Sequence, residues 1–128
     1  MSKAIKAKIL LAEDDRFISL AYKDGLSRAG FEVVHAQDGE EAILKIKKEK
    51  PDLILLDLIM PDVNGFEVLK EIKQDKELSK IPVIILSNLG QDADIEKGKK
   101  LGAADYLIKA NVSISEVVEK IKQFLKLQ

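Results

Sequence analysis

The sequence predicts an α/β fold in which one open parallel sheet carries helices on both faces. Five short apolar runs recur along the 128 residues, and segments with helical spacing separate them. Strand and helix alternate five times without a linker, and right-handed crossovers place such strands parallel in one sheet. With 46% hydrophobic residues the chain can fill one core, so we expect a single domain over residues 1–128.

The five apolar runs each have the length of a strand. They cover residues 9–12, 31–36, 53–56, 83–86 and 106–108. The first, third and fourth runs are continuously aliphatic, which is typical of central strands covered on both faces. The second run alternates more and indicates an edge. This pattern favours a doubly wound, flavodoxin-like sheet of five (βα) units with strand order 2-1-3-4-5, whose ligands gather at the carboxyl ends of strands 1 and 3.

The intervening segments have the apolar spacing of amphipathic helices. Helices are expected at residues 18–29, 38–49, 64–75 and 114–125. Ser113 and Glu116 predict a capping box at the start of the last helix. The segment 91–102 is different because its apolar content is thin and it contains Gly98. We expect a locally unstable helix there, of the kind from which switching segments are drawn.

Composition excludes several classes of function. The 21 basic and 22 acidic residues give a net charge of −1, which provides no electrostatic footprint for nucleic acid or an anionic membrane. The expected partners are therefore proteins. The chain has no cysteine, no leader-like apolar segment behind Met1 and no apolar run near the length of about 18 residues that a membrane span needs. We expect a cytoplasmic protein.

Polar residues follow four of the predicted strands. They are Glu13, Asp14 and Asp15 after the first strand, Asp57 after the third, Ser87 after the fourth and Lys109 after the fifth. Because the carboxyl ends of parallel strands meet at one edge of a sheet, these carboxylates, the hydroxyl and the ammonium should converge. Asp15 is also placed to cap the helix that follows it. His35 is interpreted as an ordinary edge-strand residue.

The converging carboxylates predict a magnesium site. Close carboxylates repel one another unless their pKa values rise or a hard divalent cation binds them. Mg²⁺ takes one or two carboxylates together with waters and phosphate oxygens, which suits Asp14 and Asp57 as ligands and Glu13 acting through water. An Asp carboxylate can also attack phosphorus to give an aspartyl phosphate. The cation, Lys109 and Ser87 could then stabilise the added charge.

These residues stand in motifs that resemble the receiver domains of two-component response regulators, in particular the stand-alone chemotaxis-regulator type. The resemblance covers nearly the whole chain. It rests on Glu13-Asp14 after the Ile-Leu-Leu-Ala strand, Leu56 to Pro61 continuing to Gly65, Ser87 after its aliphatic strand, and Gly102-Ala103-Ala104-Asp105-Tyr106 leading to Lys109.

The resemblance implies that Asp57 is the phosphoacceptor and that a histidine kinase or phosphotransfer protein supplies the phosphoryl group. It implies Mg²⁺ bound by Asp14, Asp57 and the backbone carbonyl of Ile59, with Glu13 assisting. Ser87 and Tyr106 would form the switch, and Lys109 would pair with the phosphate. The output face would comprise the fourth helix, the fifth strand and the fifth helix, where a dimer could also form.

Two residues depart from the family pattern, and two others bear on how fast the phosphoryl group is lost. Ala110 stands where the family usually has proline after the lysine, and because a non-proline cis peptide costs about 2.5–4 kcal/mol, we expect a trans or looser Lys109 loop. Asn88 replaces a small residue and could crowd phosphoryl donors or contact the phosphate. In the family, the positions two beyond the phosphoacceptor and two beyond the serine line the route of the attacking water. Here they are Ile59 and Leu89, which cannot orient a water, so we expect slow autodephosphorylation.

Three other functions remain as alternatives. A haloacid-dehalogenase-type phosphatase would need a second Asp two residues after its nucleophile and a cap insertion, whereas Ile59 occupies that position after Asp57. A flavin-binding electron carrier would need a phosphate loop rich in Ser, Thr and Gly, where this chain has acidic residues. A degenerate receiver would bind partners without phosphorylation. With no output domain expected after residue 128, the signal would leave by contact with a protein target that the sequence does not identify.

Overall fold

The computed structural model describes residues 7–127, and the prediction made from the residues directly behind Met1 lies outside this range. Its five strands are parallel and form one sheet in the order β2-β1-β3-β4-β5, as predicted. The strands are β1 (Lys8–Ala12), β2 (Glu32–Ala36), β3 (Leu53–Leu56), β4 (Val83–Ser87) and β5 (Asp105–Ile108). The three aliphatic runs are the central strands, and every residue of β3 and β4 is buried.

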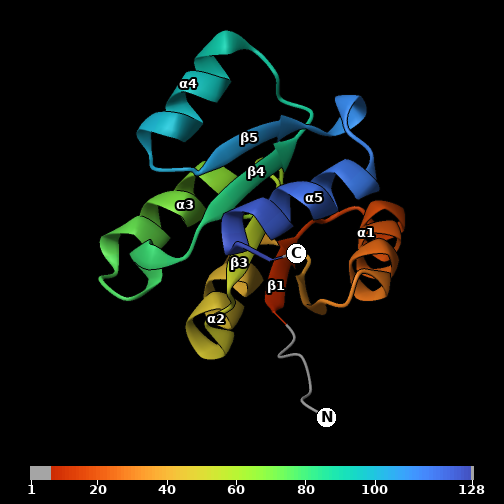
Figure 1. Ribbon diagram of the computed structural model, residues 1–128. Helices are drawn as coiled ribbons and strands as arrows, with labels where there is room; N and C mark the ends of the chain where they lie inside the picture. The colour runs from red at the N-terminus through yellow and green to blue at the C-terminus, as the bar shows by residue number, and fades with distance from the viewer. Residues whose placement is uncertain (1–6, 128) are drawn as a thin grey trace.

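Helices cover both faces of this sheet (Figure 1). They are α1 (Arg16–Arg28), α2 (Gly39–Glu49), α3 (Gly65–Gln74), α4 (Asp92–Lys100) and α5 (Ile114–Leu125), with short 3₁₀ turns η1 (Leu78–Lys80) and η2 (Lys109–Asn111). One apolar cluster lies between the sheet and α1 with α5, and a second lies between the sheet and α2 with α3. Alternate residues of the central strands belong to opposite clusters, as the period of a strand requires.

Side chains define where most helices begin. Asp15, Asp38 and Asn64 accept the backbone N–H three residues later at α1, α2 and α3. Ser113 and Glu116 form the predicted capping box at α5. In the described chain Gln91 precedes α4 without a side-chain cap, and α4 buries one residue, Gly98. The structure therefore agrees with the expectation that α4 is thinly packed.

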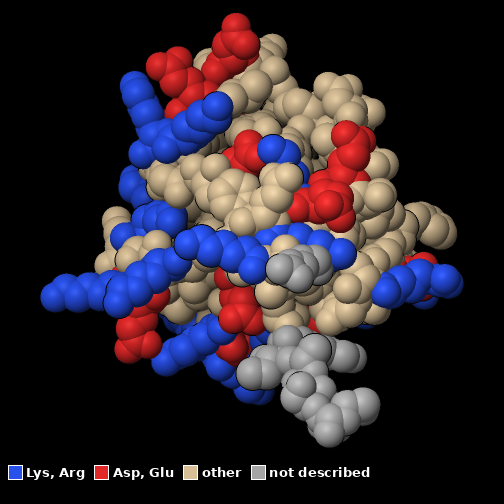
Figure 2. All heavy atoms as spheres, in the orientation of Figure 1, with Lys and Arg blue, Asp and Glu red and all other residues tan. Residues whose placement is uncertain are grey.

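The surface carries charges of both signs. Figure 2 shows a row of basic side chains across the middle of one face, with acidic side chains above and below it. Among residues 7–127, no helix combines the length and the apolar character that crossing a membrane requires.

Candidate functional site

The strand ladder continues one residue past the ends of β1 and β3 and thereby fixes two carboxylates. The Glu13 N–H donates to the Ala36 carbonyl at 3.0 Å, and the Asp57 N–H donates to the Ala12 carbonyl at 3.1 Å. Glu13 and Asp57 are buried, with residue exposures of 3% and 6%. Their backbones are held by the sheet, so both carboxylates occupy defined positions at its carboxyl edge.

Asp14 completes a cluster of three carboxylates. Glu13, Asp14 and Asp57 each offer an oxygen within 4.8 Å of the others. Asp14 is exposed, which leaves the cluster open on one side. Asp15 lies outside the cluster because its carboxylate caps α1, accepting the Ile18 N–H at 2.9 Å. The structure thus brings together the three acidic residues that the sequence singled out as metal ligands.

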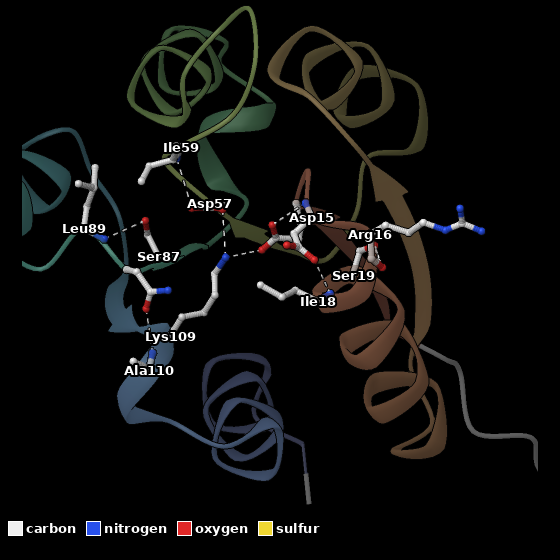
Figure 3. Close-up of polar contacts among 12 residues, drawn as sticks. Asp15, Arg16, Ile18, Ser19, Asp57, Ile59, Ser87, Leu89, Lys109 and Ala110 are labelled. Carbon is white, nitrogen blue, oxygen red and sulfur yellow. Dashed lines mark hydrogen bonds and ion pairs between the residues drawn. The ribbon is translucent and has the colours of Figure 1, made fainter.

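Lys109 reaches this cluster from the end of β5. Its ammonium donates to Asp57 Oδ2 at 3.0 Å and also to Glu13 Oε1. Figure 3 shows the Lys109 ammonium and the Ile59 backbone approaching the Asp57 carboxylate from opposite sides. The Ile59 N–H donates to Asp57 Oδ1 at 3.3 Å. Coordination by the Ile59 carbonyl stays a prediction.

Two pKa shifts follow from one cation shared by two buried carboxylates. Burial lowers the pKa of Lys109, but the hydrogen bond to Glu13 and the charge of Asp57 outweigh it, so that the pKa is raised above 10.5. Burial raises the pKa of Glu13 above 4.5, because the hydrogen bond from Lys109 offsets that cost only in part and Asp57 adds repulsion. The lysine is therefore firmly charged, and its charge compensates the burial of Glu13 only in part.

Ser87 and Tyr106 are connected through a third residue. The buried Ser87 hydroxyl accepts the Leu89 N–H at 3.3 Å. The Tyr106 hydroxyl donates to the Leu89 carbonyl. Burial raises the pKa of Tyr106, so the phenol keeps its proton for this bond. The sequence pointed to Ser87 and Tyr106 but not to this role of Leu89, because it depends on the path of the loop after β4.

Three further residues shape the site through contacts that the sequence did not predict. His35 Nε2 lies 2.8 Å from the Glu13 carbonyl and ties the ends of β1 and β2 together. A Cβ on Gly65 would lie 2.3 Å from the Asp57 carbonyl oxygen, so glycine is required where α3 passes the loop of the phosphoacceptor candidate. Asn88 Oδ1 accepts the Ala110 N–H at 3.0 Å. Among residues 7–127 every peptide bond is trans, as expected for the Lys109 loop.

Fold and site together define a doubly wound α/β domain with three carboxylates and a lysine at its topological switch point. The family model of the response regulator receiver domain matches residues 9–122. The chain therefore belongs to the response regulator receiver domain family of two-component systems. Members of this family are signalling modules rather than conventional enzymes.

Individual relatives agree with this assignment. The alkaline phosphatase synthesis transcriptional regulatory protein PhoP of Bacillus subtilis is 39% identical over 119 residues, which are 93% of this chain and 48% of that protein. The receiver domain of the Francisella response regulator 1452 has a TM-score of 0.88 and 33% identity, covering 94% of this chain and 98% of that chain. The Mn²⁺-bound form of response regulator Rcp1 has a TM-score of 0.81 and 32% identity, covering 93% and 94%. The chain spans about half the length of the curated transcriptional regulators that it matches.

Proposed function

We propose that this receiver domain accepts a phosphoryl group on Asp57 from a phosphohistidine of a partner kinase or phosphotransfer protein. The observation that carries the proposal is the environment of Asp57. Its buried carboxylate stands at the end of β3, held at Oδ2 by Lys109 and at Oδ1 by the Ile59 N–H. A nucleophile fixed in this way, with a permanent cation beside it, meets the positioning and charge requirements of phosphoryl transfer.

The carboxylate cluster fits a hard divalent cation. Its donors are oxygens only, they lie within 4.8 Å of one another, and the exposed Asp14 leaves the cluster open. Asp14 and Asp57 would hold Mg²⁺ directly, with the Ile59 carbonyl, and Glu13 would assist. When bound, the ion would neutralise charge on the phosphoryl oxygens. That Rcp1 binds Mn²⁺ supports a cation at the corresponding place in this chain.

The transfer of the phosphoryl group needs no proton donor or acceptor from this chain. An oxygen of Asp57 forms a bond to phosphorus while the P–N bond to the donor imidazole breaks, and the leaving imidazole takes a proton from solvent. The adduct adds anionic oxygens beside Glu13 and Asp14. Lys109 is charged and already within hydrogen-bond distance of Asp57, so it can follow the new charge with little movement.

Ser87 and Leu89 offer a route from the phosphoryl group to the surface. If the Ser87 hydroxyl turns toward a phosphoryl oxygen, it releases the Leu89 N–H that it now accepts. Leu89 also holds the Tyr106 hydroxyl, so the change reaches β5. Tyr106 in turn packs on Gly98 of α4. We propose the face formed by α4, β5 and α5 as the surface that binds a protein target or a second copy of the domain.

Intact mass tests the proposal. Incubation with Mg²⁺ and acetyl phosphate should add one phosphoryl group to the wild type, and chelation of Mg²⁺ should prevent it. Asp57→Ala should gain nothing, whereas Asp52→Ala, at a carboxylate before β3 that lies outside the cluster, should react like the wild type. A wild type that stays unmodified and does not bind beryllofluoride would favour a degenerate receiver that acts by constitutive contact.

A further inference from the structure

Asn88, the residue after Ser87, contacts the loop that carries Lys109. Asn88 Oδ1 accepts the Ala110 N–H at 3.0 Å, across 22 positions of sequence. Both residues are exposed, so the bond is not a by-product of core packing. The pairing of β4 with β5 ends at Ser87 and Ile108, and the bond therefore joins the segments directly beyond the last paired residues.

The Ala110 N–H needs a partner from outside its own turn. Ala110 is the second residue of η2, and the first N–H groups of a helical turn have no acceptor within it. Ile108 precedes the turn and offers no side-chain cap. The Asn88 side chain, from the segment directly after β4, thus caps the η2 turn. Asn is chemically suited to this role because its amide oxygen accepts a hydrogen bond.

We propose that Asn88 is a positioning residue that holds Lys109 against Asp57. Lys109 lies between two anchors, Ile108 in β5 and Ala110 on the Asn88 amide. A lysine side chain has several rotatable bonds, so its ammonium stays within 3.0 Å of Asp57 Oδ2 only if the backbone that carries it is fixed. This inference rests on the proposed phosphorylation of Asp57, in which the lysine follows the developing charge.

The chemistry of asparagine suits this place. The amide supplies an acceptor without a charge, whereas another carboxylate here would add negative charge near the cluster in which Glu13, Asp14 and Asp57 already repel one another. Ser87, Asn88 and Leu89 are consecutive, so one short segment contacts the lysine loop through Asn88 and Tyr106 through Leu89. Movement of Ser87 would therefore also reach the Lys109 loop.

The first test measures the bond itself. In Asn88→Ala the Ala110 amide should exchange its hydrogen with solvent about tenfold faster or more, as expected when a bond of ordinary strength is lost. Asn88→Asp keeps an oxygen at the same position and should restore slow exchange. Asn111→Ala, the same substitution at an exposed residue of the same turn, is the matched control and should leave the Ala110 amide unchanged.

The second test asks whether the bond acts through the lysine. With Mg²⁺ and acetyl phosphate, Asn88→Ala should be phosphorylated about three- to tenfold more slowly than the wild type, since small misplacements of charged groups are costly in transfer reactions. In a Lys109→Ala background the same substitution should have no further effect. Asn111→Ala should react at the wild-type rate.

The outcomes separate this inference from the proposed function. Unchanged Ala110 exchange in Asn88→Ala, or effects of Asn88→Ala and Lys109→Ala that multiply, would overturn the positioning role while phosphorylation of the wild type stood. If the wild type itself took no phosphoryl group, the proposed function would fail first. The role in phosphorylation would fail with it, and the exchange experiment would still decide whether Asn88 holds the loop.

Discussion

The Lys109 ammonium donates hydrogen bonds to two buried carboxylates, Glu13 and Asp57. The charge balance of the carboxylate cluster therefore depends on this lysine. Glu13 and Asp57 are almost fully buried, and both direct an oxygen at this ammonium. A buried carboxylate without a cation is costly, whereas an exposed pair such as Arg28 with Asp24 contributes little. The effect of substituting Lys109 should therefore be large and should depend on pH.

We expect Lys109→Met, measured with Mg²⁺ chelated, to lower the free energy of unfolding at neutral pH by about 3 kcal/mol. Loss of the cation should raise the pKa of Glu13 further, because the hydrogen bond from Lys109 now lowers it. An acid whose folded pKa is raised stabilises the fold below its unfolded pKa and loses that contribution as pH rises through the folded value. The loss should thus shrink as pH falls toward the ordinary Glu value of 4.5. Urea unfolding at several pH values measures it, and a loss independent of pH would contradict this account.

Ile59 governs a different property, the lifetime of the phosphoryl group. Ile59 is 56% exposed beside Asp57, and its side chain can neither donate a hydrogen bond to an attacking water nor accept one from it. Ile59→Asn should accelerate loss of the phosphoryl group by about tenfold or more, because an amide can orient that water. Decay of the phosphorylated mass after removal of the donor measures the rate.

A matched control is Leu44→Asn, which makes the same kind of change at an exposed apolar residue of α2. It should leave the lifetime unchanged. Equal lifetimes for wild type and Ile59→Asn, or a wild type that loses its phosphoryl group within seconds, would count against slow autodephosphorylation.

Site residues could be predicted where a strand end dictates their position, and not where a loop path does. Asp57 and Lys109 each follow a strand of the parallel sheet directly, so the topology alone brings them together. The contacts of Asn88 and Leu89 depend on how the loop after β4 turns, and no periodic pattern encodes that path. The link between Glu13 and His35 requires the register of β1 with β2.

At the scale of elements, α4 shows how a helix can be weak by itself and still be closely fitted. Its sequence predicts thin packing, with Gly98 as one cause of instability. The structure gives the glycine a further role, since a Cβ there would lie 2.6 Å from Ile85 Cδ1 and 3.1 Å from the ring of Tyr106. Glycine thus lets the backbone of α4 rest directly on the aromatic residue that the proposed switch uses.

Gly98→Ala shows whether Gly98 mainly weakens α4 or mainly allows its close packing on the sheet. Helix propensity alone predicts a gain of about 1 kcal/mol, whereas overlap with a buried isoleucine and an aromatic ring predicts a net loss of about 1 kcal/mol. We expect the loss, together with shifted NMR resonances of Tyr106, because α4 must move away from the sheet. Lys99→Ala, at an exposed position of the same helix, should change stability by less than about 0.5 kcal/mol. A stabilised Gly98→Ala variant would contradict the close packing.

Other elements were predictable because several local signals agreed. The capping box at Ser113 and the strong apolar spacing of α5 indicate the same boundaries. The 3₁₀ turns η1 and η2 were not predicted, since three-residue turns carry no periodic signal. The segment expected at 91–102 is longer than the described α4, which begins at Asp92 without a side-chain cap and ends at Lys100.

At the scale of the whole molecule, repulsion within the carboxylate cluster opposes the folding that burial of the core drives. The sheet ends force three carboxylates within 4.8 Å of one another, and Lys109 offsets that repulsion only in part. A cation that binds the folded cluster and not the unfolded chain must therefore stabilise the entire domain. The expected gain follows mass action and is about 2.7 kcal/mol at a concentration one hundred times the dissociation constant.

Two adjacent substitutions test whether that gain comes from the cluster or from general charge. Asp14→Asn removes one carboxylate from the cluster, and Asp15→Asn removes the same charge one residue later while keeping an oxygen to cap α1. The melting temperature of the wild type and of Asp15→Asn should rise with Mg²⁺, and that of Asp14→Asn should rise far less. Without Mg²⁺, Asp14→Asn should melt at or above the wild-type temperature, because it relieves repulsion. If both variants lost the response to Mg²⁺ equally, the ion would be sensing net charge near β1, and the cluster would not be its binding site.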